Sequence, residues 1–448
     1  MLPTFPPELW RAILEEATYS PPINISGLSP FNDYGMDPED PPFAKFVPQN
    51  LPVKRAAISV CRTWYHIAIA MLYETVQLDT LERAMRILQC LPSHQHTTSN
   101  ERCNGQYVRE VICYDLGQFT PGHYRIDVDD LCKGALSEIL KCFPGMLVFR
   151  FQNWPGKPLV NVAMKAIMSA PAAPTLRRLD FGITNLPSSA ISFWNDGTVA
   201  AIMKTFPSLE TLILPVESRE TEENDPNWYD DDSGEPIPRG PLDFGSIRAL
   251  GMDLELYALL HTQRIRSSRS SPLEVHLITT DNDLFDFFNF IFDMFSVDQR
   301  KLESPTEGTV NLHTVVRSLY IRQRCSPWTS VLYEIFFPKL TTLFPNLAEL
   351  VVPVPAILDN VQVSPICHPS LVRIVLDVGD SGASKEWQPE VDSVFDWLLA
   401  GRLPKLRCVC LLNATEQFYA ERAARLPIWR KRLKEKVIEF ELLPSITI

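Results

Sequence analysis

Pro207-Ser208-Leu209-Glu210-Thr211-Leu212-Ile213-Leu214 is the stretch that decides the fold. Its leucines are spaced by three and then by two residues, so a turn leads into a short strand whose alternate side chains face one way. The same pattern, with apolar replacements, begins at five other prolines: Pro144, Pro174, Pro345, Pro369 and Pro404. Within each run of consecutive copies the starts lie 24 to 35 residues apart, which predicts a structural unit repeated along the chain.

The stretches between these copies predict helices that alternate with the strands. Apolar residues recur there at three- and four-residue spacing in segments 131–143, 162–170, 199–206, 284–295, 331–344 and 391–399. Weaker strand candidates lie at 107–112, 273–277 and 315–321. Strands and helices alternating at this period resemble leucine-rich repeats, in which parallel strands are backed by helices. The asparagine that usually follows the last leucine is missing, so we predict an irregular α/β solenoid over residues 79–448.

Two segments are expected to interrupt this array, and one to end it. Residues 217–240 combine acidic side chains with prolines and glycines and lack an apolar period, which predicts an exposed loop. Residues 264–271 predict a shorter basic, serine-rich loop. Near the C-terminus an apolar stripe passes through Leu426, Trp429 and Leu433. We expect a helix there that caps the last repeat.

The N-terminus begins with a different pattern. Pro6 and Pro7 suit the start of a helix, because their fixed φ fits the first turn and their missing N–H is not needed there. Leu9, Ile13 and Leu14 then recur at helical spacing. These residues predict a short amphipathic helix at the beginning of the chain.

A second helical block follows after a gap. Residues 57–72 have apolar side chains at three- and four-residue spacing, which predicts one further amphipathic helix. The gap, at about residues 19–50, contains seven prolines and predicts a loop. We therefore expect a small all-α module over residues 1–78 that carries a proline-rich insert.

Together the two blocks resemble the F-box, the short helical domain that recruits cullin ubiquitin ligases, and most of all the F-box-like proteins of fungi. The matching stretches are Pro6-Pro7-Glu8-Leu9 with Ile13-Leu14, and Val60-Cys61-Arg62-Thr63-Trp64 with Ile67-Ala68. The resemblance implies that the module docks a Skp-family adaptor protein and, through it, a cullin. The docking residues that it implies are Pro6, Pro7, Leu9, Trp10, Ile13, Leu14, Val60, Cys61 and Trp64.

The repeat domain would then bind the target protein of the ligase. Polar residues that alternate with the apolar residues of each strand point away from the helices and are expected to face solvent. The target-binding residues predicted in this way are Arg150, Arg177, Arg178, Asp180, Glu210, Thr211, Glu349, Arg373 and Arg407.

Composition limits the cellular compartments and the binding partners that are expected for the chain. No apolar run is long enough to cross a membrane, and no secretory signal is evident. The ten cysteines are scattered, so reduced thiols in the cytoplasm or nucleus are expected. The net charge of −12 argues against binding to nucleic acid or to an anionic membrane.

Known catalytic and ligand motifs are missing from the sequence. There is no G-x-S-x-G, P-loop, G-x-G-x-x-G or H-E-x-x-H motif, so we expect neither catalytic residues nor a cofactor. Cys90, His94, His96 and Cys103 match no usual zinc finger. Cys408 and Cys410 are expected to share one face of a strand. Besides a ligase receptor, two functions stay open: a non-catalytic scaffold without ligase association, and an enzyme with an unrecognised site.

Overall fold

A computed structural model describes a subset of the chain in two compact units. The described residues are 6–17, 42–78, 81–90, 104–114, 134–152, 157–181, 183–184, 198–214, 216–217, 242–252, 257, 265–266, 273–280, 309–310, 312–322, 336–354, 365–378, 391–414 and 424–444. The first unit contains those from 6 to 217 together with 245–248. The second unit contains 242–244 and those from 249 onward.

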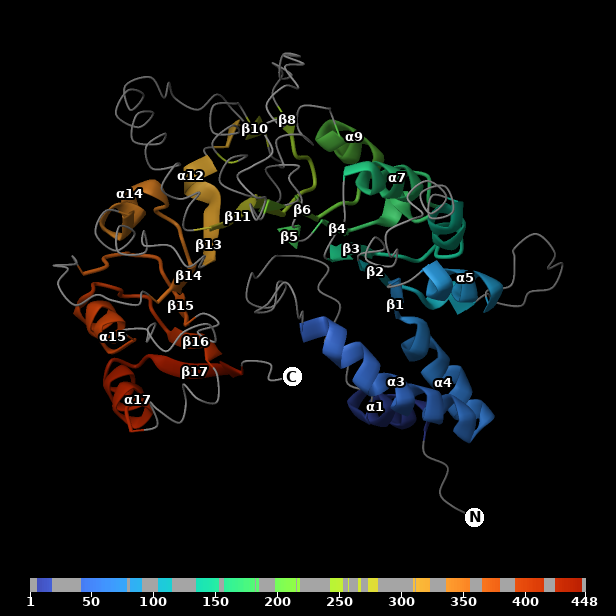
Figure 1. The fold of residues 1–448 in the computed structure, drawn as a ribbon, viewed down its shortest axis with the longest axis horizontal. Helices are drawn as coiled ribbons and strands as arrows, with labels where there is room; N and C mark the ends of the chain where they lie inside the picture. The colour runs from blue at the N-terminus through green and yellow to red at the C-terminus, as the bar shows by residue number, and fades with distance from the viewer. Residues whose placement is uncertain are drawn as a thin grey trace, which may run out of the picture. The chain divides into compact units, whose positions relative to one another are not determined.

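Twelve parallel strands dominate the described part of the chain (Figure 1). Their order in the sheet is their order in the sequence, and the pairings between them are parallel. In the first unit they are β1 (Thr75–Leu78), β2 (Glu110–Tyr114), β3 (Val148–Gln152), β4 (Arg178–Asp180) and β6 (Thr211–Ile213). In the second they are β9 (Ala249–Met252), β11 (Glu274–Thr280), β13 (Val316–Arg322), β14 (Glu349–Pro353), β15 (Arg373–Asp377), β16 (Cys408–Ala414) and β17 (Glu439–Pro444). This α/β arrangement confirms the predicted fold class and is consistent with a leucine-rich-repeat-like solenoid.

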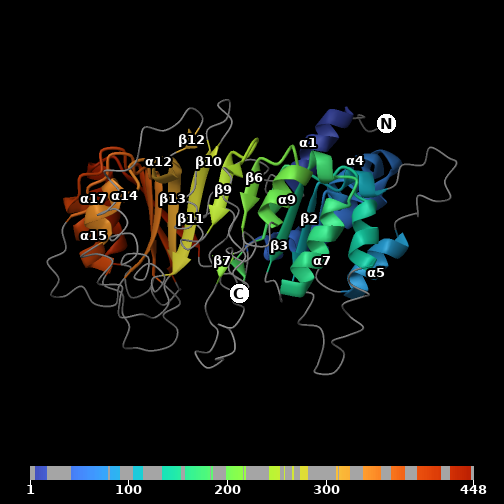
Figure 2. The same ribbon diagram turned by 90° about the horizontal axis from the view of Figure 1, so that it is seen from above.

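Helices lie along one side of the strands within each unit (Figures 1 and 2). The first unit has α5 (Leu81–Cys90), a helix at residues 134–141, α7 (Lys157–Met168) and α9 (Thr198–Thr205). The second has α12 (Leu312–Val315), α14 (Leu340–Leu343), α15 (Val391–Ala400) and α17 (Leu426–Glu435). Short 3-10 turns η1 (Asn104–Tyr107), η2 (Ala173–Thr175) and η5 (Phe337–Lys339) occur between them. Two small sheets join β5 (Ile183–Thr184) to β7 (Val216–Glu217), and β8 (Leu242–Asp243) to β10 (Ile265–Arg266) and β12 (Thr309–Val310).

The leucines of the repeat form the core, and a serine joins one repeat to the next. Leu209 and Leu212 are fully buried, as the spacing predicts. The Ser208 hydroxyl, which follows the repeat's first proline, donates to the carbonyl oxygen of Pro174 over 2.7 Å. Ser246 and Ser370 make the same bond to Pro207 and Pro345 of the preceding repeats, at 3.0 and 2.5 Å. The Pro-Ser-Leu sequence therefore encodes both a buried leucine and a repeat-to-repeat hydrogen bond.

Three strands of the sheet were missed by the sequence pattern. β1 and β17 have no proline-led copy before them, and Gly245 replaces the proline before β9. β1 also occupies the end of the module predicted to be all helical. The boundary after residue 78 itself stays a prediction.

The predicted capping helix forms as α17 but is not the last element. β17 follows it and pairs with β16, because Phe440 and Leu442 alternate with Glu439 and Glu441 as a strand requires. The end of the sheet is therefore occupied by a strand. Predicted helix 284–295 and the loop at 267–271 lie outside the described residues, as does nearly all of the acidic segment at 217–240.

The N-terminal helices differ from the prediction in two places. They are α1 (Pro7–Ala17), α3 (Pro42–Val60) and α4 (Arg62–Tyr73). The single helix predicted over 57–72 is wrong, because Cys61 has an extended backbone (φ −163°, ψ 170°) that ends one helix and begins the next. The loop predicted up to residue 50 is wrong from Pro42 onward. Proline is tolerated in the first turn of a helix, so Pro42 begins α3 instead of preventing it.

None of the helices among the residues described above is long and apolar enough to span a bilayer.

Candidate functional site

The N-terminal helices pack around a small apolar cluster. Leu14 of α1 is buried against Ala57 of α3 and Ala68 of α4. Half-buried Trp64 packs on the same cluster. Its ring also lies 4.9 Å from the ring of Trp10, tilted by 58°. Such aromatic pairs stabilise by about 0.5–1.5 kcal/mol beyond their burial, so this contact helps to hold α1 against α4.

Other apolar residues of the same helices stay at the surface. The exposed fraction is 46% for Leu9 and 42% for Ile13, which lie one turn apart on α1, and 59% for Val60 at the end of α3. Leu9 and Ile13 share one helical face because they are four residues apart. None of these three side chains is needed to close the apolar cluster. Leu9 and Ile13 form an apolar patch on α1, and Val60 is a further exposed apolar side chain on α3.

The nine predicted docking residues therefore divide into three groups, which are exposed, half-buried and buried. Exposed members are Pro6, Pro7, Leu9, Ile13, Val60 and Cys61, while Trp10 and Trp64 are half-buried. Leu14 is a correction, because it is 2% exposed and its side chain belongs to the core. Leu14 follows Ile13 directly, and a step of one residue turns a side chain about 100° around a helix of 3.6 residues per turn.

Two exposed residues of these helices were not predicted. Val53 of α3 and Tyr65 of α4 are each more than 40% exposed. Val53 lies three residues after the end of the segment predicted as a proline-rich loop, so its helical neighbours could not be recognised. Tyr65 follows Trp64 directly, and its exposure could have been inferred from helical spacing alone.

A buried lysine and a glutamate lie where these helices meet the sheet. Lys54 of α3 is buried, and burial lowers the pKa of its ammonium group although Glu74 opposes the shift. Burial likewise raises the pKa of Glu74, at the end of α4, while Lys54 lowers it. Each charge thus partly offsets the desolvation of the other. The pair belongs to the structure of the helical region and not to its exposed surface.

The strand residues predicted to bind a target have very different exposures. Arg407 is exposed, and Arg177, Glu210, Glu349 and Arg373 are partly exposed. Arg177 pairs with Glu210 of the next repeat, and its Nε donates to a Glu210 carboxylate oxygen over 2.8 Å. These five residues satisfy the expectation of a solvent-facing position at least in part.

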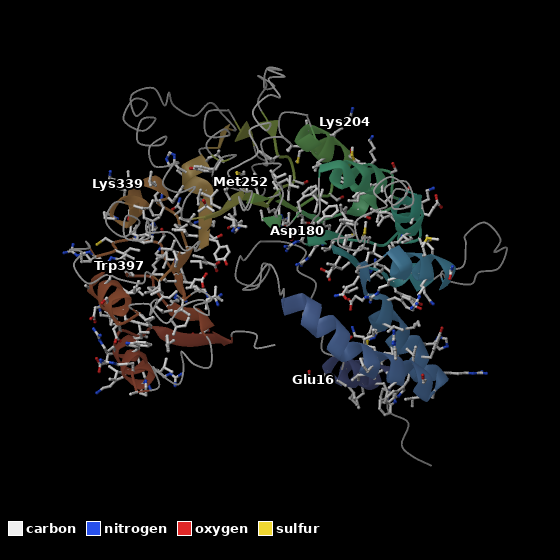
Figure 3. All side chains as sticks on the ribbon, viewed as in Figure 1. Glu16, Asp180, Lys204, Met252, Lys339 and Trp397 are labelled. Carbon is white, nitrogen blue, oxygen red and sulfur yellow. The ribbon has the colours of Figure 1, made fainter. Side chains whose placement is uncertain are left out.

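Four others do not face solvent, which corrects the prediction. Arg178 is 0% exposed and Asp180 is 3% exposed, and Arg150 and Thr211 are also buried. Arg178 Nη2 lies 2.8 Å from Asp180 Oδ2 on the same strand, and Arg150 Nε lies 3.0 Å from Glu110 Oε1 of β2. Figure 3 shows Asp180 on the side of the strands away from Lys204 of α9, as the alternation predicts for this residue. The three charged side chains tolerate burial because Arg178 is paired with Asp180 and Arg150 with Glu110.

In the second unit, parallel register brings a row of polar residues side by side. His276, Ser318, Glu349, Arg373, Cys408 and Glu439 occupy matching positions on β11, β13, β14, β15, β16 and β17. His276 Nδ1 is 2.7 Å from Ser318 Oγ. Burial raises the pKa of Glu349, while Arg373 opposes the shift. Of these six residues, the sequence analysis predicted only Glu349 and Arg373 as target-binding residues, because the register between the strands was not known.

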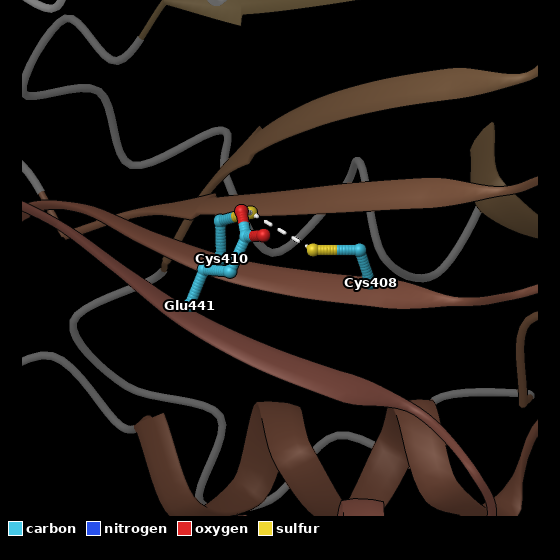
Figure 4. Close-up of side chains that lie close together, drawn as sticks. All are labelled: Cys408, Cys410 and Glu441. Carbon is cyan, nitrogen blue, oxygen red and sulfur yellow. Dashed lines mark hydrogen bonds between the residues drawn. The ribbon is translucent and has the colours of Figure 1, made fainter.

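Beside this row, β16 and β17 bring two thiols and a carboxylate together (Figure 4). Cys408 Sγ is 3.4 Å from Cys410 Sγ, and the Cys410 thiol donates to Glu441 Oε2 over 3.4 Å. Arg373 Nη2 lies 3.5 Å from the same carboxylate oxygen. Burial raises the pKa of both thiols above the ordinary value. The expectation that the two cysteines share a strand face is confirmed.

Comparison of the chain with protein-family models and with curated proteins finds no match.

Proposed function

We propose that the protein is the substrate-recognition subunit of a cullin-type ubiquitin ligase. Its N-terminal helices would dock a Skp-family adaptor, and its strands would bind the target protein. The observation that carries the proposal is the exposure of Leu9, Ile13 and Val60. These apolar residues belong to the F-box-like motif and stay at the surface of helices that already have a packed core.

Their exposure is informative because the same helices could have buried them. Leu14, Ala57 and Ala68 close the contacts between α1, α3 and α4, while Leu9 keeps an exposed fraction of 46%. Exposed apolar side chains that cluster on one surface are typical of protein-binding sites. Leu9 and Ile13 therefore support docking to a partner with an apolar groove.

The strands offer a surface of a different kind for the target. Arg177, Glu349, Arg373 and Arg407 keep part of their side chains in solvent. Charged rims of this kind favour specificity and the rate of encounter. Holding a target near a ligase raises its effective concentration, so such a receptor needs no catalytic residue of its own.

The adaptor proposal is tested by measuring binding of the full chain to a purified Skp-family adaptor by calorimetry. Leu9→Asp and Ile13→Lys should each weaken binding by about 30-fold or more, because loss of a hot spot costs at least about 2 kcal/mol. Leu9→Asp leaves the helix intact, since an acidic residue in the first turn suits the helix dipole. Val437→Asp is the matched control, because Val437 is 86% exposed and lies outside the helical region.

Two outcomes would contradict the proposal. Wild-type affinity in both variants would remove the docking surface on α1. No binding of the adaptor to the wild-type chain would remove the ligase association altogether and leave the scaffold.

A non-catalytic scaffold is the second candidate, and the break at Cys61 favours it. The F-box-like resemblance spans Val60 to Trp64, but these residues lie on two different helices. A scaffold needs exposed apolar residues without needing that motif on one helix. Affinity capture followed by identification of the bound proteins separates the two functions, because only a ligase receptor should retain both an adaptor and a cullin.

A further inference from the structure

The last two strands of the sheet assemble a set of possible metal ligands from distant parts of the sequence. Cys408 and Cys410 lie two residues apart on β16 and therefore point to the same face. Parallel register places Glu441 of β17 directly beside Cys410. The ligand atoms of Cys408, Cys410 and Glu441 all lie within 4.8 Å of one another. Among the described residues, no other three side chains of His, Cys, Asp or Glu form such a group.

We propose that Cys408, Cys410 and Glu441 bind a thiophilic divalent cation, with Zn²⁺ as the physiological ion. Thiolate ligands select Zn²⁺ over Mg²⁺ and Ca²⁺, which prefer oxygen ligands alone. The site does not rest on the proposed ligase function, since none of its three residues is among those proposed to dock the adaptor or to contact the target.

The spacing of the three side chains suits one tetrahedral ion. With Zn–S bonds of about 2.3 Å, two thiolates on one ion lie roughly 3.8 Å apart, and a thiolate and a carboxylate oxygen lie about 3.6 Å apart. The corresponding distances here are 3.4 Å between the sulfur atoms and 3.4 Å from Cys410 Sγ to Glu441 Oε2. The ligand atoms of all three side chains lie within 4.8 Å of one another, and the side chains stand close together on the two strands (Figure 4).

The surrounding charge also suits a bound divalent cation. Two thiolates and a carboxylate carry three negative charges, of which the ion neutralises two. The guanidinium of Arg373, 3.5 Å from Glu441 Oε2, supplies the remaining positive charge. Binding exchanges the two thiol protons for the cation, so protons are released to solvent as the ion enters.

The ion can reach this site and would keep one position open. Cys408 is partly exposed and Glu441 is exposed, whereas Cys410 is buried at the back of the group. Three protein ligands leave the fourth position of a tetrahedral ion to water.

Cobalt titration of the full chain tests the proposal, because Co²⁺ bound to thiolates absorbs in the near ultraviolet and its tetrahedral complexes absorb in the visible. The chain is kept reduced with a phosphine that does not chelate metals. We expect one equivalent of Co²⁺ to give both bands, and Zn²⁺ but not Mg²⁺ to remove them. Loss of an outer-shell partner lowers metal affinity by about 10- to 100-fold. Cys410→Ser removes a ligand itself, so it should lower the affinity for Co²⁺ by more than that.

Controls and a milder variant make the result decisive. Cys61→Ser and Cys367→Ser replace exposed thiols elsewhere and should leave the bands unchanged. Glu441→Gln alters an exposed side chain that does not need to be buried for folding. It should keep the thiolate band but weaken binding by about 10-fold or more.

Three results would overturn the site. The first is the absence of both bands in the wild-type chain. The second is an equal loss of the bands in Cys61→Ser or Cys367→Ser, which would assign the signal to other thiols. The third is unchanged affinity in Glu441→Gln, which remains measurable even if Cys410→Ser does not fold.

Discussion

The N-terminal helices and the parallel sheet depart from the usual placement of side chains in opposite ways. On α1 and α3, Leu9, Ile13 and Val60 are apolar and exposed. On the strands of the first unit, Arg178, Asp180 and Arg150 are charged or ion-paired and buried. Large apolar residues usually lie inside a protein, and charged residues are rarely buried unless they are paired. The helices therefore leave apolar side chains in solvent, whereas the strands bury charged side chains as pairs.

The difference shows which unusual residues are available to a partner. The helices are held together by Leu14, Ala57 and Ala68, so the exposed apolar residues are not required by the fold. The buried charges of the sheet are balanced by each other and are required by it. A charged strand residue is therefore a weaker candidate for recognition than an exposed leucine, although its chemistry suits recognition better.

The largest loss of stability is expected from a substitution that removes one member of a buried ion pair. Arg178→Ala leaves the Asp180 carboxylate buried without the guanidinium 2.8 Å away. Breaking a buried ion pair in this way costs about 3–5 kcal/mol. Urea denaturation followed by circular dichroism should show the loss as a lower midpoint.

A double variant provides the control for that experiment. Arg178→Met with Asp180→Leu removes both charges and keeps apolar volume, and such replacements are often neutral. We expect the double variant to be markedly more stable than Arg178→Ala. If the two variants are equally unstable, the loss does not come from leaving the Asp180 carboxylate without Arg178, because the double variant has no carboxylate at position 180.

Neighbouring residues of α1 provide the next test. Leu14→Ala should destabilise the helical region by about 2–5 kcal/mol, because it opens a cavity in the apolar cluster. Ile13→Ala should change stability by no more than about 0.5 kcal/mol, since surface substitutions have small effects and alanine favours helices. Hydrogen exchange of the α1 and α4 amides measures both variants. Equal losses in the two would show that the exposed face of α1 is also part of the core.

The sequence predicted the repeating strands because each copy contains its own local instructions. Pro207-Ser208-Leu209 specifies a turn, a hydrogen bond to the preceding repeat and a buried leucine within three residues. β9 was missed because Gly245 stands in the proline position, although Ser246 makes the equivalent bond to Pro207. That serine, followed by Ile247 and Leu250, was the signal that could have identified the strand.

Burial of the charged residues could not be predicted in the same way. Whether Arg150 faces solvent depends on its distance from Glu110, which is forty positions earlier in the chain and meets it only through strand register. The Cys410–Glu441 contact has the same origin. The exposed face of α1 needed only helical spacing, so most of that site could be predicted locally. Leu14 was the exception, because its neighbours Ala57 and Ala68 belong to other helices.

A smaller effect is expected from a buried residue that is polar but uncharged. His368 is buried, and its Nε2 lies 3.0 Å from the carbonyl oxygen of Phe344, to which it must donate. Its Nδ1 accepts from the Ser370 N–H over 3.3 Å, so the neutral ring has a partner at each nitrogen. Burial lowers the pKa of His368 below its ordinary value of 6.5.

The sign of the pH effect follows from that shift. Above pH 6.5 the ring is neutral in both the folded and the unfolded chain, and its stabilising contribution is fully present. As the pH falls, the unfolded chain takes up the proton first, so the free energy of unfolding decreases. Urea denaturation between about pH 7.5 and 5.5 should show a steeper loss for the wild type than for His368→Gln. The same slope in both proteins would contradict the assignment.

The smallest loss of stability is expected at Arg177, which directly precedes Arg178, the site of the largest expected loss. Arg177 precedes Arg178 and also pairs with an acid, Glu210, but its side chain is 40% exposed whereas that of Arg178 is fully buried. Exposed ion pairs contribute about 0–1 kcal/mol, because water and salt screen them. Arg177→Ala should therefore lower the free energy of unfolding far less than Arg178→Ala, and the small difference should shrink further in high salt. If both substitutions are equally costly, burial does not distinguish structural charges from available ones, and Arg177 would lose its place among the residues proposed to contact a target.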